Sequence, residues 1–259
     1  MSLTYSSYLE LNQILTAQHP RSAGPEHDEM LFIIIHQVYE LWFKQILHET
    51  DYLSDLLRQN DQTRTLHTLR RILTILKTLV GQIDILETMT PLEFLSFRDR
   101  LESASGFQSY QFRELEFALG HKRRTVMAHY ADDPTAVAHL ETRFAQPTLW
   151  DAFLAFLVAN GHELPGEVIH RDVTEAVRPS PALQQILIRI YRQDARTLRV
   201  CERLVDLDEG LQEWRYRHIK MVERTIGTKR GTGGSSGVGY LHTTLKPFFP
   251  DLWAIRAEL

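Results

Sequence analysis

The sequence is short of cysteine: Cys201 is the single one among 259 residues. One thiol cannot form an intrachain disulfide or a cysteine-based zinc or iron–sulfur site. Any metal must therefore be held by His, Asp, Glu or a porphyrin. The shortage also fits a reducing compartment, and we expect a cytoplasmic protein.

Long apolar runs are absent too, and the longest, residues 152–159, is far shorter than a membrane span. The first residues lack the basic and apolar regions of a secretory signal, so we expect no membrane partner. Charge of one sign is equally scarce, because 29 Lys and Arg face 33 Asp and Glu for a net charge of −4. The sequence therefore lacks the basic footprint that nucleic-acid binding requires, and we expect no such partner.

Strict alternation of polar and apolar residues, the pattern of a half-buried strand, does not occur convincingly anywhere. Apolar residues instead recur at intervals of three and four, which predicts an all-α protein. With 43% hydrophobic residues the chain can bury a large core in one domain. The predicted helices span residues 7–18, 26–58, 62–88, 92–101, 107–119, 134–144, 148–160, 181–207 and 211–226.

His36 lies off the main apolar stripe of the helix predicted at 26–58, at about 100° from Ile35 when each residue turns the helix by about 100°. It falls between Phe32 and Phe43, on a second apolar patch. A helix that is apolar on two faces must be covered on both, so we expect His36 to be shielded from water. A core histidine bonded to a backbone carbonyl and a ligand-binding histidine both fit this pattern.

His218 occupies a position in the helix predicted at 211–226 where the apolar spacing calls for a hydrophobic residue. A neutral imidazole in an apolar pocket is how an axial haem ligand is placed, although a hydrogen-bonded core histidine fits as well. The flanking Arg215, Arg217 and Lys220 either neutralise haem propionates or solvate the outer face of the helix.

Two further features are suited to a small ligand. The segment 227–239 holds six of the 13 glycines, but it lacks the Gly-Lys-Ser/Thr ending of a phosphate loop and the spacing of a dinucleotide fingerprint. It is either a loop that closes over a ligand or a flexible linker. Arg98 stands beside Phe94 and Phe97, where it can fork a substrate carboxylate or pair with a nearby acid.

A di-iron helical bundle is an alternative built from the same residue types. Such sites need two Glu-x-x-His pairs on long helices. The chain has one, Glu167-x-x-His170, in a stretch bounded by Pro and Gly. His36 and Glu40 are spaced to share a metal, but no third ligand is evident.

Taken together, these segments resemble the tryptophan 2,3-dioxygenase family of the bacterial type. The blocks that carry the resemblance follow the family's order over nearly the whole chain: MLFIIIHQVYELWFK at 30–44, FRD at 97–99, SGFQS at 105–109, WRYRH at 214–218, GTKRGTGGSSG at 227–237 and FFPDLW at 248–253.

The resemblance implies a helical haem enzyme that adds both atoms of O2 across the indole C2–C3 bond of L-tryptophan to give N-formylkynurenine. It implies one haem b per chain, with His218 as the iron ligand and a pocket lined by Ser105 and Gly106. His36 would lie near the indole nitrogen. Among the substrate contacts, Phe32 and Leu101 would pack on the indole ring, Arg98 would bind the carboxylate, and Thr232 would reach the ammonium and carboxylate. Phe94 would be a further substrate contact.

The resemblance also implies a homotetramer, in which residues 1–25 contribute to a neighbouring subunit and residues 26–259 form the haem-binding catalytic domain. Tyr5, Tyr8 and Leu9 would reach the neighbour's pocket. Relatives often carry Tyr where this chain has Phe94, so a phenol that would help to hold the carboxylate is missing. An indoleamine dioxygenase is the nearest enzymatic alternative, and a haem-binding sensor or carrier without turnover is the alternative of another class.

Overall fold

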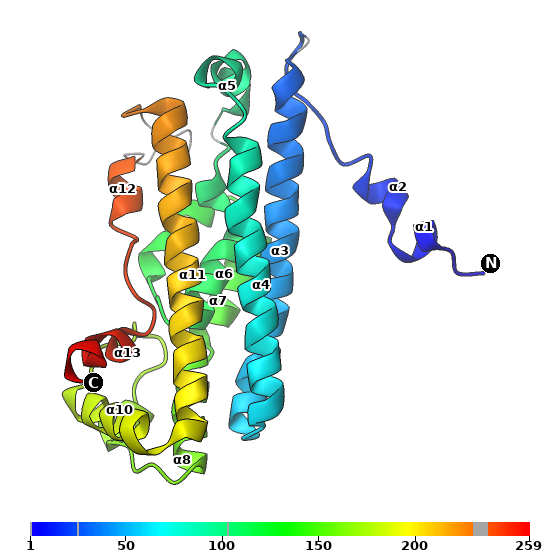
Figure 1. Cartoon of the computed structure of the whole chain (residues 1–259). Coiled ribbons are helices and arrows are strands. Elements are labelled where there is room, and N and C mark those ends of the chain that lie inside the picture. The colour runs from blue at the N-terminus through cyan, green and yellow to red at the C-terminus, as the bar shows by residue number, and fades with distance from the viewer. Residues whose placement is uncertain (1, 25, 103, 230–237) are drawn as a thin grey trace.

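The computed structural model describes residues 2–24, 26–102, 104–229 and 238–259, and this part of the chain is helical with no strand. The all-α prediction is confirmed. Three long helices, α3 (His27–Arg58), α4 (Gln62–Leu86) and α11 (Ala195–Ile226), form the frame. Figure 1 shows them running side by side, and α4 packs against both α3 and α11.

Shorter helices cover this frame on one side and at its ends (Figure 1). They are α5 (Pro91–Arg98), α6 (Tyr110–Leu119), α7 (Pro134–Ala145), α8 (Leu149–Ala159), α9 (Gly166–Ile169), α10 (Pro181–Gln193), α12 (Val238–His242) and α13 (Pro250–Ala254). Turns of 3-10 helix lie at Asp99–Leu101, Gly106–Gln108, Arg124–Tyr130 and Ile255–Glu258. Among the described residues, no helix combines the length and apolar character needed to cross a membrane.

Local capping explains where several helices begin and end. Thr90 and Glu93 form a capping box in front of Pro91, and Thr148 forms another at the start of α8. Gly120 ends α6 in the left-handed region, with φ of 113°, which a residue with a side chain rarely adopts. The capping side chains of Thr90, Glu93 and Thr148 satisfy backbone groups that the helices themselves leave without partners.

The prediction of one helix from 181 to 207 and another from 211 is wrong on both counts. The break lies at Asp194, whose carboxylate accepts hydrogen bonds from the backbone N–H groups of Arg196 and Thr197 and so starts α11. No break occurs near residue 210. Helix α11 is continuous through Gly210. A Cβ on Gly210 would lie 3.3 Å from Leu76 Cδ1, so the glycine lets α4 approach α11 closely.

The N-terminal arm differs from the predicted helix at 7–18. It forms two short helices, α1 (Tyr5–Tyr8) and α2 (Leu11–Ile14), separated by Glu10 with φ of 51°. Figure 1 shows both lying away from the bundle. The arm is tethered at its C-terminal end, where the buried Glu29 carboxylate accepts the backbone N–H groups of Arg21 and Ser22 at 2.6 and 3.0 Å.

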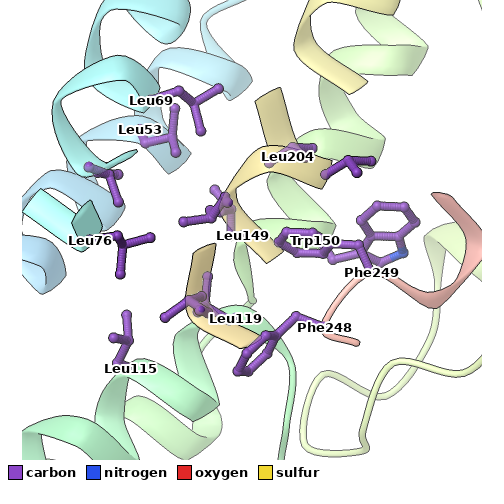
Figure 2. Close-up of a cluster of buried hydrophobic side chains, with 14 of the residues drawn as sticks. Leu53, Leu69, Leu76, Leu115, Leu119, Leu149, Trp150, Leu204, Phe248 and Phe249 are labelled. Carbon is purple, nitrogen blue, oxygen red and sulfur yellow. The ribbon is translucent and has the colours of Figure 1, made fainter. Parts of the chain in front are cut away.

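The main core fills the space between the long helices and the covering segments. Figure 2 shows leucines of α3, α4, α6 and α11 meeting Trp150, Phe248 and Phe249. The C-terminal segment is fixed over this core by Asp208, which is fully buried on α11. Its Oδ2 atom accepts the Phe249 backbone N–H at 2.9 Å and the Trp253 indole N–H at 3.0 Å.

We predict that Asp208→Asn lowers the free energy of unfolding by about 1–3 kcal/mol, because the amide turns a donor toward the two N–H groups. Chemical denaturation monitored by far-UV circular dichroism measures this loss. Asp206→Asn is the matched control, since Asp206 is partly exposed and pairs with Arg203 at the surface, and its effect should stay below about 0.5 kcal/mol. Equal effects of the two substitutions would contradict the anchoring role of Asp208.

Candidate functional site

A cavity lies between α3, α5, α6, α11 and α12, with α4 contributing part of its wall. The cavity has a volume of about 250 Å³. The lining is mostly apolar, as in sites that take small organic ligands. The cavity brings together eight of the predicted residues, namely Phe32, His36, Phe94, Arg98, Leu101, Ser105, Gly106 and His218.

His218 projects into this cavity from α11. Its ring stacks on that of Trp214, one turn earlier, with centroids 5.6 Å apart. Neither ring nitrogen forms a hydrogen bond with the described residues. Burial, and to a smaller extent the charge of His36, lowers the pKa of His218 to about 4. The imidazole is therefore neutral at neutral pH, with a lone pair available to a metal.

His36 is half-buried on α3 and is held by its own helix. Its Nδ1 atom lies 2.6 Å from the carbonyl oxygen of Phe32. Because a carbonyl only accepts, Nδ1 carries the proton, and Nε2 is left as an acceptor in the neutral ring. Burial lowers the pKa of His36 and so favours this neutral form. The backbone bond expected of a core histidine is therefore present, and it orients a ring that lines the cavity. Binding of a ligand by His36 stays a prediction.

Aromatic rings form one wall beside His36. The Phe32 ring centroid lies 4.1 Å from that of His36, 5.7 Å from that of Phe94 and 5.5 Å from that of Phe97. Arg98 follows directly at the end of α5, so a cation and a set of aromatic faces border the same space. This arrangement suits a ligand with a flat ring and a carboxylate.

A cluster of ion pairs around a buried carboxylate, which sequence reasoning missed, borders the same cavity. We call Glu116 with Arg113, Arg123 and Arg215 the arginine cluster. The Glu116 carboxylate is 1% exposed and accepts Arg113 Nη1 at 2.7 Å and Arg215 Nη2 at 2.6 Å. Burial alone would raise the pKa of Glu116, but the three guanidinium groups lower it to about 2. A signal was present, since Arg113 and Glu116 lie beside the apolar Phe112, Leu115 and Phe117 in this helix.

The residues of the cavity fit a haem group. A neutral imidazole without a hydrogen-bond partner suits an iron ligand, and the apolar walls suit a porphyrin. The arginine cluster carries two positive charges in excess of its one carboxylate, and the Nε atoms of its three arginines are buried without partners. Haem brings two carboxylates of opposite charge.

Other predicted features lie elsewhere. Arg217 pairs with Asp84 on α4 at 2.7 Å, and Lys220 pairs with Glu223 on the exposed face of α11 at 2.8 Å, so neither belongs to the cavity. Of the three flanking cations, Arg215 alone lines it. The Glu-x-x-His pair lies on and directly after the four-residue helix α9, not on a long helix.

The N-terminal residues do not reach the cavity of their own chain. Tyr5 and Tyr8 are 76% and 71% exposed on the arm, and Leu9 follows them. Thr232 falls within residues 230–237, outside the described part, and the predicted roles of these four residues stay predictions.

Comparison with known proteins gives one consistent result. The family model described as tryptophan 2,3-dioxygenase matches residues 1–160 and 169–259. The chain is 64% identical to tryptophan 2,3-dioxygenase of Herpetosiphon aurantiacus, a match that covers 100% of this chain and 99% of that protein. It is 54% identical to the enzyme of Anaeromyxobacter dehalogenans, with 100% and 97% covered, and 42% identical to that of Caulobacter vibrioides, with 99% and 98% covered.

The matches cover nearly all of this chain, and the relatives align over almost all of their own length. The chain therefore belongs to the tryptophan 2,3-dioxygenase family, whose members depend on haem.

Proposed function

We propose that the cavity binds one haem b through His218 and L-tryptophan beside it, and that these residues carry out the family's cleavage of the indole C2–C3 bond by O2. The observation that carries the proposal is the meeting of His218, His36 and Arg98 in one apolar cavity. Neither the relatives nor the family model supports a sensor, a carrier or an indoleamine dioxygenase.

Haem supplies the activation of O2, which in its triplet ground state does not attack a closed-shell indole. The protein supplies the iron ligand and the surroundings. His218 is suited to ligation because its imidazole is neutral and forms no hydrogen bond with the described residues. Arg113 and Arg215 are suited to the porphyrin carboxylates because they line the cavity with excess positive charge.

The substrate is oriented by its two ends. Arg98 forks the tryptophan carboxylate, while Phe32, Phe94 and Leu101 pack on the indole ring. Ser105 and Gly106 line the haem side of the same space, and Thr232 contacts the ammonium and carboxylate groups. Fixing both ends of the substrate holds the indole C2–C3 bond in one place, which removes the entropic cost of finding that geometry during reaction.

His36 orients the indole nitrogen. Its Nε2 atom is left as an acceptor by the bond from Nδ1 to Phe32, and it can accept the indole N–H. Removing the proton completely is far uphill, because a free indole N–H is a very weak acid and burial lowers the pKa of His36 from its ordinary value. We therefore assign His36 a hydrogen bond to the substrate and no role as an obligatory base.

The N-terminal arm belongs to a homotetramer in this proposal. Tyr5 and Tyr8 are large aromatic residues left exposed on a segment that lies away from its own bundle (Figure 1). Burying them, with Leu9, in a neighbouring subunit's site would remove this apolar surface from water. Residues 1–25 would then serve the neighbour, while residues 26–259 form the catalytic domain. The single cysteine supports a cytoplasmic location.

We expect His218→Ala to lose haem, because no other imidazole offers the same partnerless nitrogen from α11. The measurement is the Soret absorption of protein reconstituted with haem, and the control is His36→Ala, which should keep haem. A normal Soret band and normal turnover in His218→Ala would overturn the ligand assignment.

We expect Arg98→Ala to reduce kcat/KM for L-tryptophan by about tenfold to a hundredfold, since a charged hydrogen bond is worth roughly 1.5–3 kcal/mol. Haem content should not change. Arg98→Lys keeps the charge without the fork and should restore part of the activity at most. The clamp is refuted if the native enzyme turns over L-tryptophan and tryptamine, which lacks the carboxylate, equally well.

We expect His36→Ser to retain turnover at about one tenth to one hundredth of the native rate, the cost of one orienting hydrogen bond. The variant should also accept 1-methyltryptophan better than the native enzyme does, because the imidazole no longer opposes the methyl group. Steady-state assays with both substrates measure this. Complete loss of turnover in folded, haem-loaded variant would show that His36 is an essential base.

A further inference from the structure

Glu116 is a buried carboxylate for which the proposed reaction has no use. It lies on α6 at the centre of the arginine cluster and touches groups from three separate parts of the chain. Arg113 comes from the same helix, Arg123 from the loop after it, and Arg215 from α11. Arg123 Nη2 lies 3.0 Å from both carboxylate oxygens. One acid therefore sets the positions of three guanidinium groups.

The cluster holds more positive charge than Glu116 can balance. Burial and the charges of Arg113 and Arg123 lower the pKa of Arg215 despite its bond to Glu116. Among the described residues that line the cavity, the other acid is Glu40, which accepts the side-chain amide of Gln111 at 2.9 Å. Without an orienting acid, buried guanidinium groups repel one another and separate. Glu116 is placed to prevent this.

The same cluster contacts the segment that follows residue 237. Arg123 Nη1 donates to the Tyr240 hydroxyl at 3.2 Å, and Arg215 Nη1 donates to the carbonyl oxygen of Thr244. The Tyr240 ring also packs edge-on against Phe107, with centroids 5.4 Å apart. Both Tyr240 and Thr244 line the cavity. The position of α12 and the residues after it is thus tied to the arginines that Glu116 holds.

We propose that Glu116 is a positioning residue that directs Arg113 and Arg215 toward the two carboxylates of the porphyrin. Through these contacts it also couples binding of the carboxylates to the position of residues 238–244. The inference rests on the proposed haem site and names how that site recognises the cofactor's carboxylates. The competing explanation is that Glu116 only lowers the net charge. The two differ in one respect, because positioning depends on the length of the side chain and charge balance does not.

Haem and its dimethyl ester separate the two explanations, since they share iron and ring but the ester lacks both carboxylates. We expect native protein to bind haem more tightly than the ester. Glu116→Asp keeps the charge and shortens the side chain, and it should reduce this preference by about tenfold or more. Glu116→Gln should reduce it as well, even though it adds net positive charge. Taking the ratio of the two affinities removes any general loss of stability.

An unchanged preference in Glu116→Asp, or a larger one in Glu116→Gln, would show that Glu116 is a counter-charge alone. If Glu116→Gln does not fold, Glu116→Asp decides by itself. Failure of the native protein to bind either porphyrin through His218 would instead refute the haem proposal, so the two failures are distinguishable. Equal native affinity for haem and its ester would refute the carboxylate seat while leaving the iron ligand intact.

The link to residues 238–244 has its own readout in hydrogen exchange of their backbone amides. Haem should slow this exchange more than the dimethyl ester does. Tyr240→Phe, which removes the hydroxyl that accepts from Arg123, should reduce the difference, whereas the control Tyr216→Phe on the exposed face of α11 should not. Equal slowing by both porphyrins in native protein, or an unaltered difference in Tyr240→Phe, would refute the link.

Discussion

The cavity must stay open inside a bundle whose apolar side chains gain free energy by closing over it. Two arrangements keep its walls apart. Helix α4 packs against both α3 and α11 and so sets the spacing between the helices that bear His36 and His218. On the other side, the salt bridges of Glu116 fix α6 and α11 by charge. These charged groups would lose their partners if they moved into the apolar core. They therefore keep this wall of the cavity in place, whereas a leucine at the same position would move inward.

The two histidines illustrate how one residue type is prepared for different work. His36 has a backbone partner that fixes its tautomer and leaves one acceptor atom pointing away from its own helix. The His218 ring stacks on the Trp214 indole, and neither of its nitrogens bonds to any residue in the described part of the chain. A group that is to bind a metal is left without partners, while a group that is to orient a substrate is held by one. Both are kept neutral by burial, which is the condition that each role needs.

Local patterns in the sequence were enough for α3 and α4 and for the apolar settings of His36 and His218. They failed where the deciding contact is distant. Asp194 caps α11, but in the sequence it looks like any other acidic residue in a polar stretch. The need for glycine at position 210 is explained by its contact with Leu76 on another helix. The sequence shows Arg215 only as one of three cations that flank His218, because its carboxylate partner lies 99 positions earlier in the chain. Site residues at 230–237 rest on the resemblance alone.

The anchoring of the C-terminal segment by Asp208 bears on how the chain is synthesised. Phe248, Phe249, Leu252 and Ile255 are essentially fully buried, and they come later in the chain than α11. Domains fold from the N-terminus as the chain leaves the ribosome, but this core lacks part of its cover until residues 248–255 have been added. The nascent bundle therefore exposes an apolar face along α11 until these residues emerge and pack on it.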